Sequence, residues 1–419
     1  MKCIEILPLR EQAKIRNRWL RDRLETILPE LMDREGFDMW IVIAREYNED
    51  PVVLSLLPEP KMAARRRTIL VFYRRPGIAE PGQAVERLTI STGSVAAPGF
   101  YSQGWAKGEP DQWHALKQVV EDRDPSSIGI NVSETFAFGD GLTYSEYLKL
   151  MEALGPKYFK RTRNAERLAV GWLERRSLDE MRTYSGIVRI CHQIVADAFS
   201  GKVVHPGVTT PADVAWWMRQ RISDLGLTAW FPPSVDAQRC GVEDVDSDMP
   251  ILPGDLLHCD VGFYYLGLAS DIQQNAYVLR PGEENAPAGL VSALVVGNRM
   301  QDIVMSHICK GRTGNEILLK SVNEAEKSGI KGRVYCHPIG YHGHGAGPSI
   351  GLWAQQGRVP GSGDYEAFED TCHALELSIL HEVPEWNGQE VCMALEEDIL
   401  YTDGKVYLLD GRQEQLHLI

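Results

Sequence analysis

Two aspartates, Asp260 and Asp271, lie eleven residues apart in the segment HCDVGFYYLGLASDIQQNAYVL. The segment is rich in β-branched and aromatic residues on both sides of the letters YYLG, a pattern that predicts a β-hairpin. With a turn centred on Tyr265 and Leu266, the two aspartates would lie opposite each other, with Cβ atoms within roughly 5.5 Å. Carboxylates at that distance repel, so one is protonated or a cation lies between them. A divalent metal would serve as this cation.

Further residues of metal-binding type follow the two aspartates. The stretch HPIGYHGHGAGPSIG supplies His337, His342 and His344. Glycines surround these imidazoles, so backbone and metal could approach closely. In HALELSIL, Glu376 is the only acid on its face of a predicted strand. The sequence therefore indicates an oxygen-rich metal site that contains imidazole.

A third group of acids interrupts the strand-like run VCMALEEDILYTDG, namely Glu396, Glu397 and Asp398. Acids within apolar strands are rarely buried without a partner. Adjacent strand residues face opposite sides, so one of Glu396 and Glu397 would face the site and the other the solvent. The ligand types then follow the order Asp, Asp, His, Glu, Glu over about 140 residues.

This order of motifs resembles a known family. The phrase PGDLLHCDVG, then SDI, GHGAG, Glu376 and the Glu397-Asp398 pair look like those of the pita-bread metallohydrolases, which include methionine aminopeptidase, Xaa-Pro aminopeptidase, prolidase and creatinase. The two-domain Xaa-Pro peptidases resemble the chain most. The resemblance implies an α/β (α+β) protein, with an N-terminal creatinase-like α/β domain over residues 1–165 and a C-terminal pita-bread domain over residues 166–419.

The resemblance also implies a site for two divalent metals. Asp260 would bind one metal through both oxygens, and Asp271 and Glu397 would bridge the pair. This leaves Glu396 as the solvent-side neighbour of Glu397. His344 and Glu376 would complete the shell of the second metal. Manganese is the expected metal, with zinc, cobalt or iron as alternatives. In such sites a bridging water loses a proton and attacks the substrate, here the amide of a short peptide or a modified amino acid.

Two departures from the family concern the residues that assist catalysis. Family peptidases usually have a histidine seven residues after the metal histidine, and counting from His344 that place is Gly351. Family peptidases also have a histidine in a loop that binds the substrate. The corresponding stretch of this chain, FPPSVDAQRCG, has Arg239 in that place, and an arginine is suited to binding a substrate carboxylate. His337 or His342 would take over the assisting role. The metal histidine stays open, since GHG favours His344 and a comparison of HPIG with the family's HGLG favours His342.

Two other functions remain open on the same scaffold. One is a creatinase-like or otherwise divergent enzyme that acts on a non-peptide C–N bond, because a fold does not determine the chemistry. The other is a metal-free binding protein that keeps the pita-bread shape. Metal content separates this binding protein from the enzymes, and turnover of dipeptides separates a peptidase from a creatinase-like enzyme.

The predicted elements around these residues also fit this organisation. A surface helix is expected over residues 9–35. Strands FDMWIVIA, RRTILVFYRR, ERLTIST and SIGINV and the helix DQWHALKQVVEDRD predict an α/β layer domain. A long helix is expected over residues 177–199. The next helix starts with Thr210 as its cap and Pro211 at its first position.

Composition favours a two-domain globular enzyme. The chain has 419 residues, of which 44% are hydrophobic and 24% charged. A net charge of −14 argues against binding to nucleic acid or to anionic membranes. The N-terminal residues have no signal-peptide pattern, no window is apolar enough to span a membrane, and the eight cysteines read as reduced thiols. We therefore expect a cytoplasmic enzyme, and the resemblance adds that it forms a homodimer.

Overall fold

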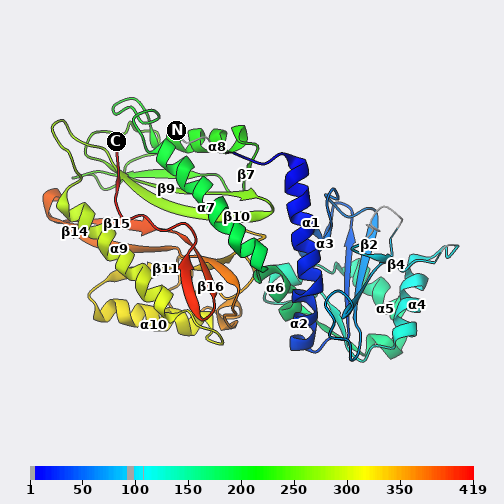
Figure 1. Ribbon diagram of the computed structural model, residues 1–419. Coiled ribbons are helices and arrows are strands. Elements are labelled where there is room, and N and C mark those ends of the chain that lie inside the picture. The colour runs from blue at the N-terminus through cyan, green and yellow to red at the C-terminus, as the bar shows by residue number, and fades with distance from the viewer. Residues whose placement is uncertain (1–4, 92–98, 107) are drawn as a thin grey trace. The chain divides into compact units, whose positions relative to one another are not determined.

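The computed structural model describes residues 5–91, 99–106 and 108–419 (Figure 1). Two compact units are distinguished by the contacts within them, one comprising Leu7–Ser177 and the other built mainly from Leu178–Ile419. The division follows Ser177, whereas the sequence places the domain boundary after residue 165. The mixed α/β architecture confirms the predicted fold class.

The first unit is built on one mixed sheet with the strand order β4-β3-β2-β1-β5-β6. Strand β1 pairs antiparallel with β2 and parallel with β5, so all the residues of MWIVIA within it are buried. The strands are β1 (Met39–Arg45), β2 (Arg67–Arg74), β3 (Val85–Thr89), β4 (Ser102–Gln103), β5 (Ile128–Ile130) and β6 (Thr162–Asn164). Each predicted strand of this unit is thus present, although the last residue of ERLTIST lies outside the described residues.

Helices cover this sheet. Residues 9–35 form two helices where the sequence predicts one, and the break between them falls at Thr26, whose φ of −114° departs from the usual helical value. Helices α4 and α5 supply Leu116, Val120, Leu150 and Leu154 to the core beside the sheet. The helices of this unit are α1 (Leu9–Glu25), α2 (Ile27–Glu35), α3 (Pro51–Leu56), α4 (Gln112–Arg123), η1 (Ala137–Gly139), α5 (Tyr144–Phe159) and α6 (Glu166–Glu174).

The second unit contains the predicted site and is organised around the hairpin of β9 and β10. Strand β10 pairs with β9 and β18, β9 also pairs with β7 and β8, and β10 contacts β12, β13, β15 and β16 of two further sheets. Those sheets have the strand orders β11-β14-β15 and β12-β13-β16-β17. The strands are β7 (Thr228–Ala229), β8 (Ser234–Gln238), β9 (Leu256–Tyr265), β10 (Leu268–Tyr277), β11 (Lys331–Val334), β12 (His337–Ile339), β13 (Thr371–Ala374), β14 (Leu377–Val383), β15 (Gln389–Leu395), β16 (Asp398–Thr402), β17 (Lys405–Leu408) and β18 (His417–Leu418).

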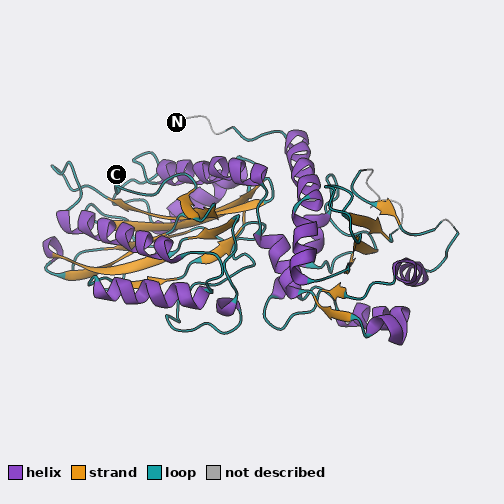
Figure 2. Ribbon diagram, turned by 60° about the horizontal axis from the view of Figure 1, so that its bottom comes forward, coloured by secondary structure: helices purple, strands orange, loops and turns teal. Residues whose placement is uncertain are grey.

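Two pairs of helices enclose these strands (Figures 1 and 2). Helix α7 packs on β9 and β10 and α8 packs on β8, while α9 packs on β14 and β15 and also against α10. Thr210 and Asp213 form a capping box at the start of α8, which confirms the prediction that Thr210 caps this helix. The helices are α7 (Leu178–Ala198), α8 (Pro211–Asp224), α9 (Ala288–His307), α10 (Gly314–Lys327), η2 (Ser362–Asp364) and η3 (Pro384–Trp386).

The turn of the central hairpin lies one residue later than the sequence predicts. Leu266 and Gly267 have φ angles of 55° and 82°, which suit a two-residue type I′ turn. The register therefore pairs Asp260 with Gln273, and Asp271 with Gly262. The expected direct pairing of Asp260 with Asp271 is wrong, because moving the turn by one residue changes every partner by two.

The described residues contain seven cysteines, and all of them are free. Across the same residues, the helices are all too short or too polar to cross a bilayer.

Candidate metal centre

The hairpin register brings Asp260, Asp271 and Gln273 to one face of the sheet. Directly paired residues share a face, and so do residues two apart on one strand. Asp271 therefore lies diagonally across from Asp260, with Gln273 opposite it. A side chain at Gly262, opposite Asp271, would collide with the indole of Trp230, because its Cβ would lie 2.3 Å from Trp230 Nε1.

His337 and Glu396 come to the same place from other sheets. His337 Nε2 lies 3.6 Å from Asp271 Oδ2 and 3.4 Å from Glu396 Oε1. One ligand atom from each of Asp271, His337 and Glu396 lies within 4.8 Å of the others, and all three residues are buried. The structure thus brings Glu396, rather than Glu397, to Asp271. Glu396 is 1% exposed, so its predicted solvent position is wrong.

Glu376 joins this group through Gln273. The side-chain amide of Gln273 donates to Glu376 Oε1 at 3.0 Å and to Glu396 Oε2 at 2.9 Å. Glu376 lies between β13 and β14, where Ala374 pairs with both His337 and Asp398. We call Asp260, Asp271, His337, Glu376 and Glu396 the ligand cluster.

The charged groups of the ligand cluster shift one another's pKa values. Burial, followed by the Glu396 carboxylate, raises the pKa of Asp260 to about 7 and that of Glu376 to about 8. The same two causes raise the pKa of Asp271 well above its usual value. Burial lowers the pKa of His337, but Asp271 and Glu396 outweigh burial and raise it well above the usual value. Additional positive charge would relieve this repulsion between carboxylates.

Unsatisfied atoms in the ligand cluster agree with a metal site. Asp260 Oδ1, Asp271 Oδ1, His337 Nε2 and Glu396 Oε1 are buried, and none has a hydrogen-bond partner among the described residues. Buried polar atoms without partners are costly and uncommon. Carboxylate oxygen and imidazole nitrogen are donors to divalent transition metals. The residues present therefore fit the divalent metal that the sequence predicts.

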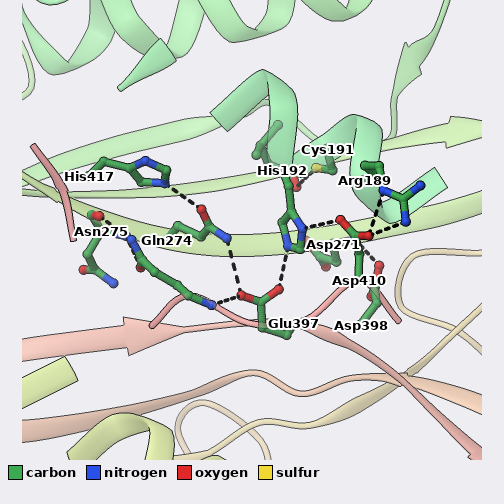
Figure 3. Close-up of polar contacts among 12 residues, drawn as sticks. Arg189, Cys191, His192, Asp271, Gln274, Asn275, Glu397, Asp398, Asp410 and His417 are labelled. Atoms are coloured by element: carbon green, nitrogen blue, oxygen red, sulfur yellow. Dashed lines mark hydrogen bonds and ion pairs between the residues drawn. The ribbon is translucent and has the colours of Figure 1, made fainter. Parts of the chain in front are cut away.

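Glu397 takes part in a different set of contacts (Figure 3). Its carboxylate accepts from the Gln413 backbone N–H at 2.9 Å and Gln274 Nε2 at 3.4 Å, and lies 2.7 Å from His192 Nε2. His192 Nδ1 in turn lies 3.1 Å from Asp410 Oδ2. We call His192, Gln274, Glu397, Asp410 and Gln413 the backing network. These contacts contradict the predicted bridging position of Glu397.

In the backing network the acidic side chains lie next to cationic ones. Burial lowers the pKa of His192, but the hydrogen bonds and charges of Glu397 and Asp410 raise it to about 9. Arg189 adds a second cation, 2.9 Å from Asp410 Oδ1. His192 lies on α7. The helical pattern of apolar residues around it in the sequence does not indicate that it contacts Glu397 and Asp410. Its carboxylate partners lie more than 200 residues away, so only the fold reveals the pairing.

The histidine-rich loop places His344 beside the ligand cluster. Its ring centroid lies 4.7 Å from that of His337 and 5.1 Å from that of Trp230. Gly343 permits this packing, because a Cβ there would lie 2.2 Å from the Trp230 ring. Burial, then the charge of His337, lowers the pKa of His344 to about 4, which leaves the ring neutral near pH 7. His342 follows β12, where its backbone oxygen accepts from Gly340.

The spacing of the histidines in the sequence could have identified His337 as the histidine of the ligand cluster and His344 as the assisting one. His344 lies seven residues after His337, and this is the family spacing that the sequence lacks when it is counted from His344. With His337 in the ligand cluster, Gly351 is no longer a missing histidine. Gly351 itself has a φ of 81°, and a Cβ there would lie 2.2 Å from the Val334 carbonyl oxygen.

Arg239 is engaged away from the ligand cluster. Its guanidinium donates to both carboxylate oxygens of the buried Asp255, at 2.7 and 2.8 Å, and to the Pro250 carbonyl at 2.9 Å. A bidentate pair of this kind holds both side chains in place. The Arg239 guanidinium is therefore engaged by Asp255 and Pro250, and these contacts give no support to the predicted binding of a substrate carboxylate.

A cavity of about 410 Å³ opens next to the residues that border the ligand cluster. Its wall includes His258, which contacts Gln273, and Trp353, which is 50% exposed. The described residues of the lining include acidic side chains but neither lysine nor arginine. The acidic lining residues are Asp236, Glu243, Asp244 and Glu390.

Comparisons with solved structures show the same fold over more than nine-tenths of the chain. The X-Pro aminopeptidase from Thermotoga maritima is 14% identical with a TM-score of 0.65, covering 92% of this chain and 99% of that one. The Xaa-Pro dipeptidase from Bacillus anthracis is 16% identical with a TM-score of 0.60, covering 97% and 100%. The N-terminal domain of the FACT complex subunit SPT16 from chickpea is 13% identical with a TM-score of 0.55, covering 96% and 99%. No curated protein sequence matches the chain.

The fold and the ligand cluster define a pita-bread metallohydrolase with an additional N-terminal unit. The sequence profile of metallopeptidase family M24 matches residues 183–403, which is more than half of the chain. The chain therefore belongs to metallopeptidase family M24. This confirms the resemblance on which the predicted fold and enzyme class rest.

Proposed function

We propose that this protein is a metal-dependent peptidase of the Xaa-Pro type whose metals bind at the ligand cluster. The observation that carries the proposal is the convergence of buried carboxylate and imidazole atoms that lack hydrogen-bond partners among the described residues. The proposed ligands are Asp260, Asp271, His337, Glu376 and Glu396. Glu396 and His337 thus take the places that the sequence analysis gives to Glu397 and His344.

The charge of the ligand cluster supports a pair of ions. Four carboxylates carry a formal charge that two divalent cations would balance, whereas one cation would leave repulsion between buried acids. A set of mostly oxygen donors with one imidazole suits manganese, which we keep as the expected metal. The homodimer and the cytoplasmic location likewise stay predictions from the sequence.

Chemistry at the site combines the metals with the neutral His344. When bound, such ions polarise a carbonyl group and lower the pKa of a water molecule. His344 stands at the exposed edge of the ligand cluster, where its ring could hydrogen-bond a substrate carbonyl or a leaving amine. Trp230 and Tyr335, with centroids 5.1 and 5.8 Å from that of His344, hold its ring. No catalytic role is assigned to His342 or Arg239.

The substrate is proposed to be a short peptide with a positively charged group. The acidic lining of the cavity would attract a cation, and the exposed Trp353 offers an aromatic face to it. This reverses the preference for an anionic substrate that Arg239 suggests in the sequence. Peptides with Lys or Arg side chains should therefore have higher kcat/KM than the same peptides with Glu. Asp244→Asn should reduce this ratio, and it is a better test than Glu390, which pairs with Lys331 at 2.6 Å.

A creatinase-like activity is the second candidate. The same acidic cavity that favours a basic peptide would also accept the guanidinium of a small creatine-like compound. The two candidates differ in whether a peptide amide or a non-peptide C–N bond is broken. The match to metallopeptidase family M24 and the fold shared with an X-Pro aminopeptidase and an Xaa-Pro dipeptidase favour the peptidase.

The deciding experiment is a metal analysis joined to a substrate screen. Metal-stripped protein is reconstituted with Mn²⁺ and assayed on Xaa-Pro dipeptides, tripeptides and creatine-like compounds, with Glu396→Gln as the inactive control. We expect about two ions per chain and hydrolysis of at least one Xaa-Pro peptide. Hydrolysis of creatine-like compounds alone would favour the second candidate. Tight metal binding with no hydrolysis of any peptide would contradict the peptidase assignment.

A further inference from the structure

Gln273 stands between the two glutamates of the ligand cluster, and its backbone is held on both sides. It pairs with Asp260 within the hairpin. It also exchanges two backbone hydrogen bonds with Glu396, each 3.2 Å long. Its side chain is almost completely buried, at 4% exposure. Gln273 therefore has little freedom to point elsewhere.

The orientation of the Gln273 amide follows from its neighbours. Nε2 lies 3.0 Å from Glu376 Oε1 and 2.9 Å from Glu396 Oε2, so both of its hydrogens are donated to carboxylates. Oε1 lies 2.9 Å from His258 Nε2. A flipped amide would direct its oxygen at two carboxylates, which is repulsive. One orientation therefore satisfies all three contacts.

His258 fixes this orientation from the side of the cavity. Its Nε2 donates to the Gln273 oxygen, and its Nδ1 lies 2.8 Å from Asp236 Oδ2. Asp236 and His258 are paired directly across β8 and β9, and both line the cavity. The contacts form a continuous line from Asp236 through His258 and Gln273 to Glu376 and Glu396.

We propose that Gln273, oriented by His258, is a positioning residue that holds Glu376 and Glu396 in the geometry that binds metal. Its amide ties down one oxygen of each glutamate, while Glu396 Oε1 stays directed toward His337. Residues that orient metal ligands from outside the coordination sphere typically contribute about 10–100-fold to metal affinity. The inference rests on the proposed metal centre. It also implies that the cavity-lining residue His258 affects metal affinity through Gln273.

Metal titration of two matched variants tests this inference. Gln273→Met removes the amide but keeps the length of the side chain, and Gln274→Met does the same one residue later, where the amide contacts Glu397 instead. Isothermal titration of Mn²⁺ into metal-stripped protein should show affinity about 10–100-fold weaker for Gln273→Met. Gln274→Met should stay within about threefold of wild type. Equal affinities for Gln273→Met and Gln274→Met would overturn the inference.

His258→Phe gives a second test without changing any group that touches the glutamates. Because His258 acts through Gln273, its substitution should weaken Mn²⁺ binding in the wild-type protein but add little in the Gln273→Met background. Fully additive losses would contradict the proposed line of contacts. A wild-type protein without a tight Mn²⁺ site would refute the metal centre itself, whereas tight binding by both wild type and Gln273→Met would refute only the role of Gln273.

Discussion

The ligand cluster and the backing network both combine carboxylates with an imidazole, yet they differ in how their polar atoms are satisfied. In the backing network, the Glu397 carboxylate has an imidazole, an amide and a backbone N–H as partners. In the ligand cluster, Asp260, Asp271, His337 and Glu396 each keep a buried atom without a hydrogen-bond partner among the described residues. Buried polar groups in a finished structural network are hydrogen-bonded, so the unsatisfied set is the one suited to a ligand.

Adjacent residues contribute to opposite sides of this comparison. Glu396 belongs to the ligand cluster and Gln273 contacts it, while Gln274 and Glu397 belong to the backing network. The period-two alternation of a strand accounts for the separation. Because each pair consists of two identical residue types, the role of a side chain depends on the face of the strand on which it lies.

The largest effect is expected from exchanging the two neighbouring glutamates for glutamine, one at a time. Glu396→Gln should weaken metal binding by more than about 100-fold, because losing even an outer partner of a ligand costs about 10–100-fold. Glu397→Gln should keep the metal content, since it lies on the other face. Metal analysis and calorimetric titration measure both. The reverse result would return the bridging role to Glu397.

The two histidines of the loop should separate binding from turnover. His337→Ala should lose metal, because its Nε2 lies within the ligand cluster. His344→Ala should keep the metal but lower kcat by about 10²–10⁴-fold, the usual contribution of a group that transfers protons. Metal content and kcat of each reconstituted variant check this prediction. Loss of metal from His344→Ala with retention in His337→Ala would support the assignment made from GHG.

Arg239→Met should reduce stability and leave substrate binding unchanged. The substitution leaves the buried Asp255 carboxylate without its bidentate partner, which costs about 3 kcal/mol of unfolding free energy. Adding Asp255→Asn should recover part of the loss, because the buried charge is removed. Urea unfolding gives the stability and steady-state kinetics give KM. A rise in KM of about tenfold without loss of stability would restore Arg239 to the substrate site.

The pH dependence of stability should identify the charged state of the backing network. The folded pKa of His192 is raised to about 9 from 6.5, so its protonated form stabilises the fold. This contribution is complete below pH 6.5 and is lost as pH rises to about 9. The difference in unfolding free energy between wild type and His192→Asn should therefore shrink over this range by on the order of 3 kcal/mol, because each pKa unit corresponds to about 1.4 kcal/mol.

Urea unfolding of metal-stripped wild type and His192→Asn at several pH values makes the measurement. Taking the difference between the two proteins cancels the titration of the ligand cluster, which both share. A difference that is constant across this pH range would show that His192 does not carry the charge.

Local patterns in the sequence determined the architecture and part of the site. Alternating and periodic hydrophobic residues mark the strands and helices, and Thr210 marks a helix start, because these signals arise from neighbours along the chain. The spacing of Asp260 and Asp271 indicated a hairpin with two acids on it. The structure places both, with Glu376, in the ligand cluster.

Tertiary structure alone decided which neighbouring residue faces the site. Strand alternation shows that Glu396 and Glu397 point in opposite directions, but which face meets His337 depends on how three sheets pack. The partners of Arg239 and His192 were also undetermined, because an ion pair forms where the fold brings opposite charges together. Asp255 and Asp410 were equally visible in the sequence, and only the three-dimensional packing assigns them to those cations.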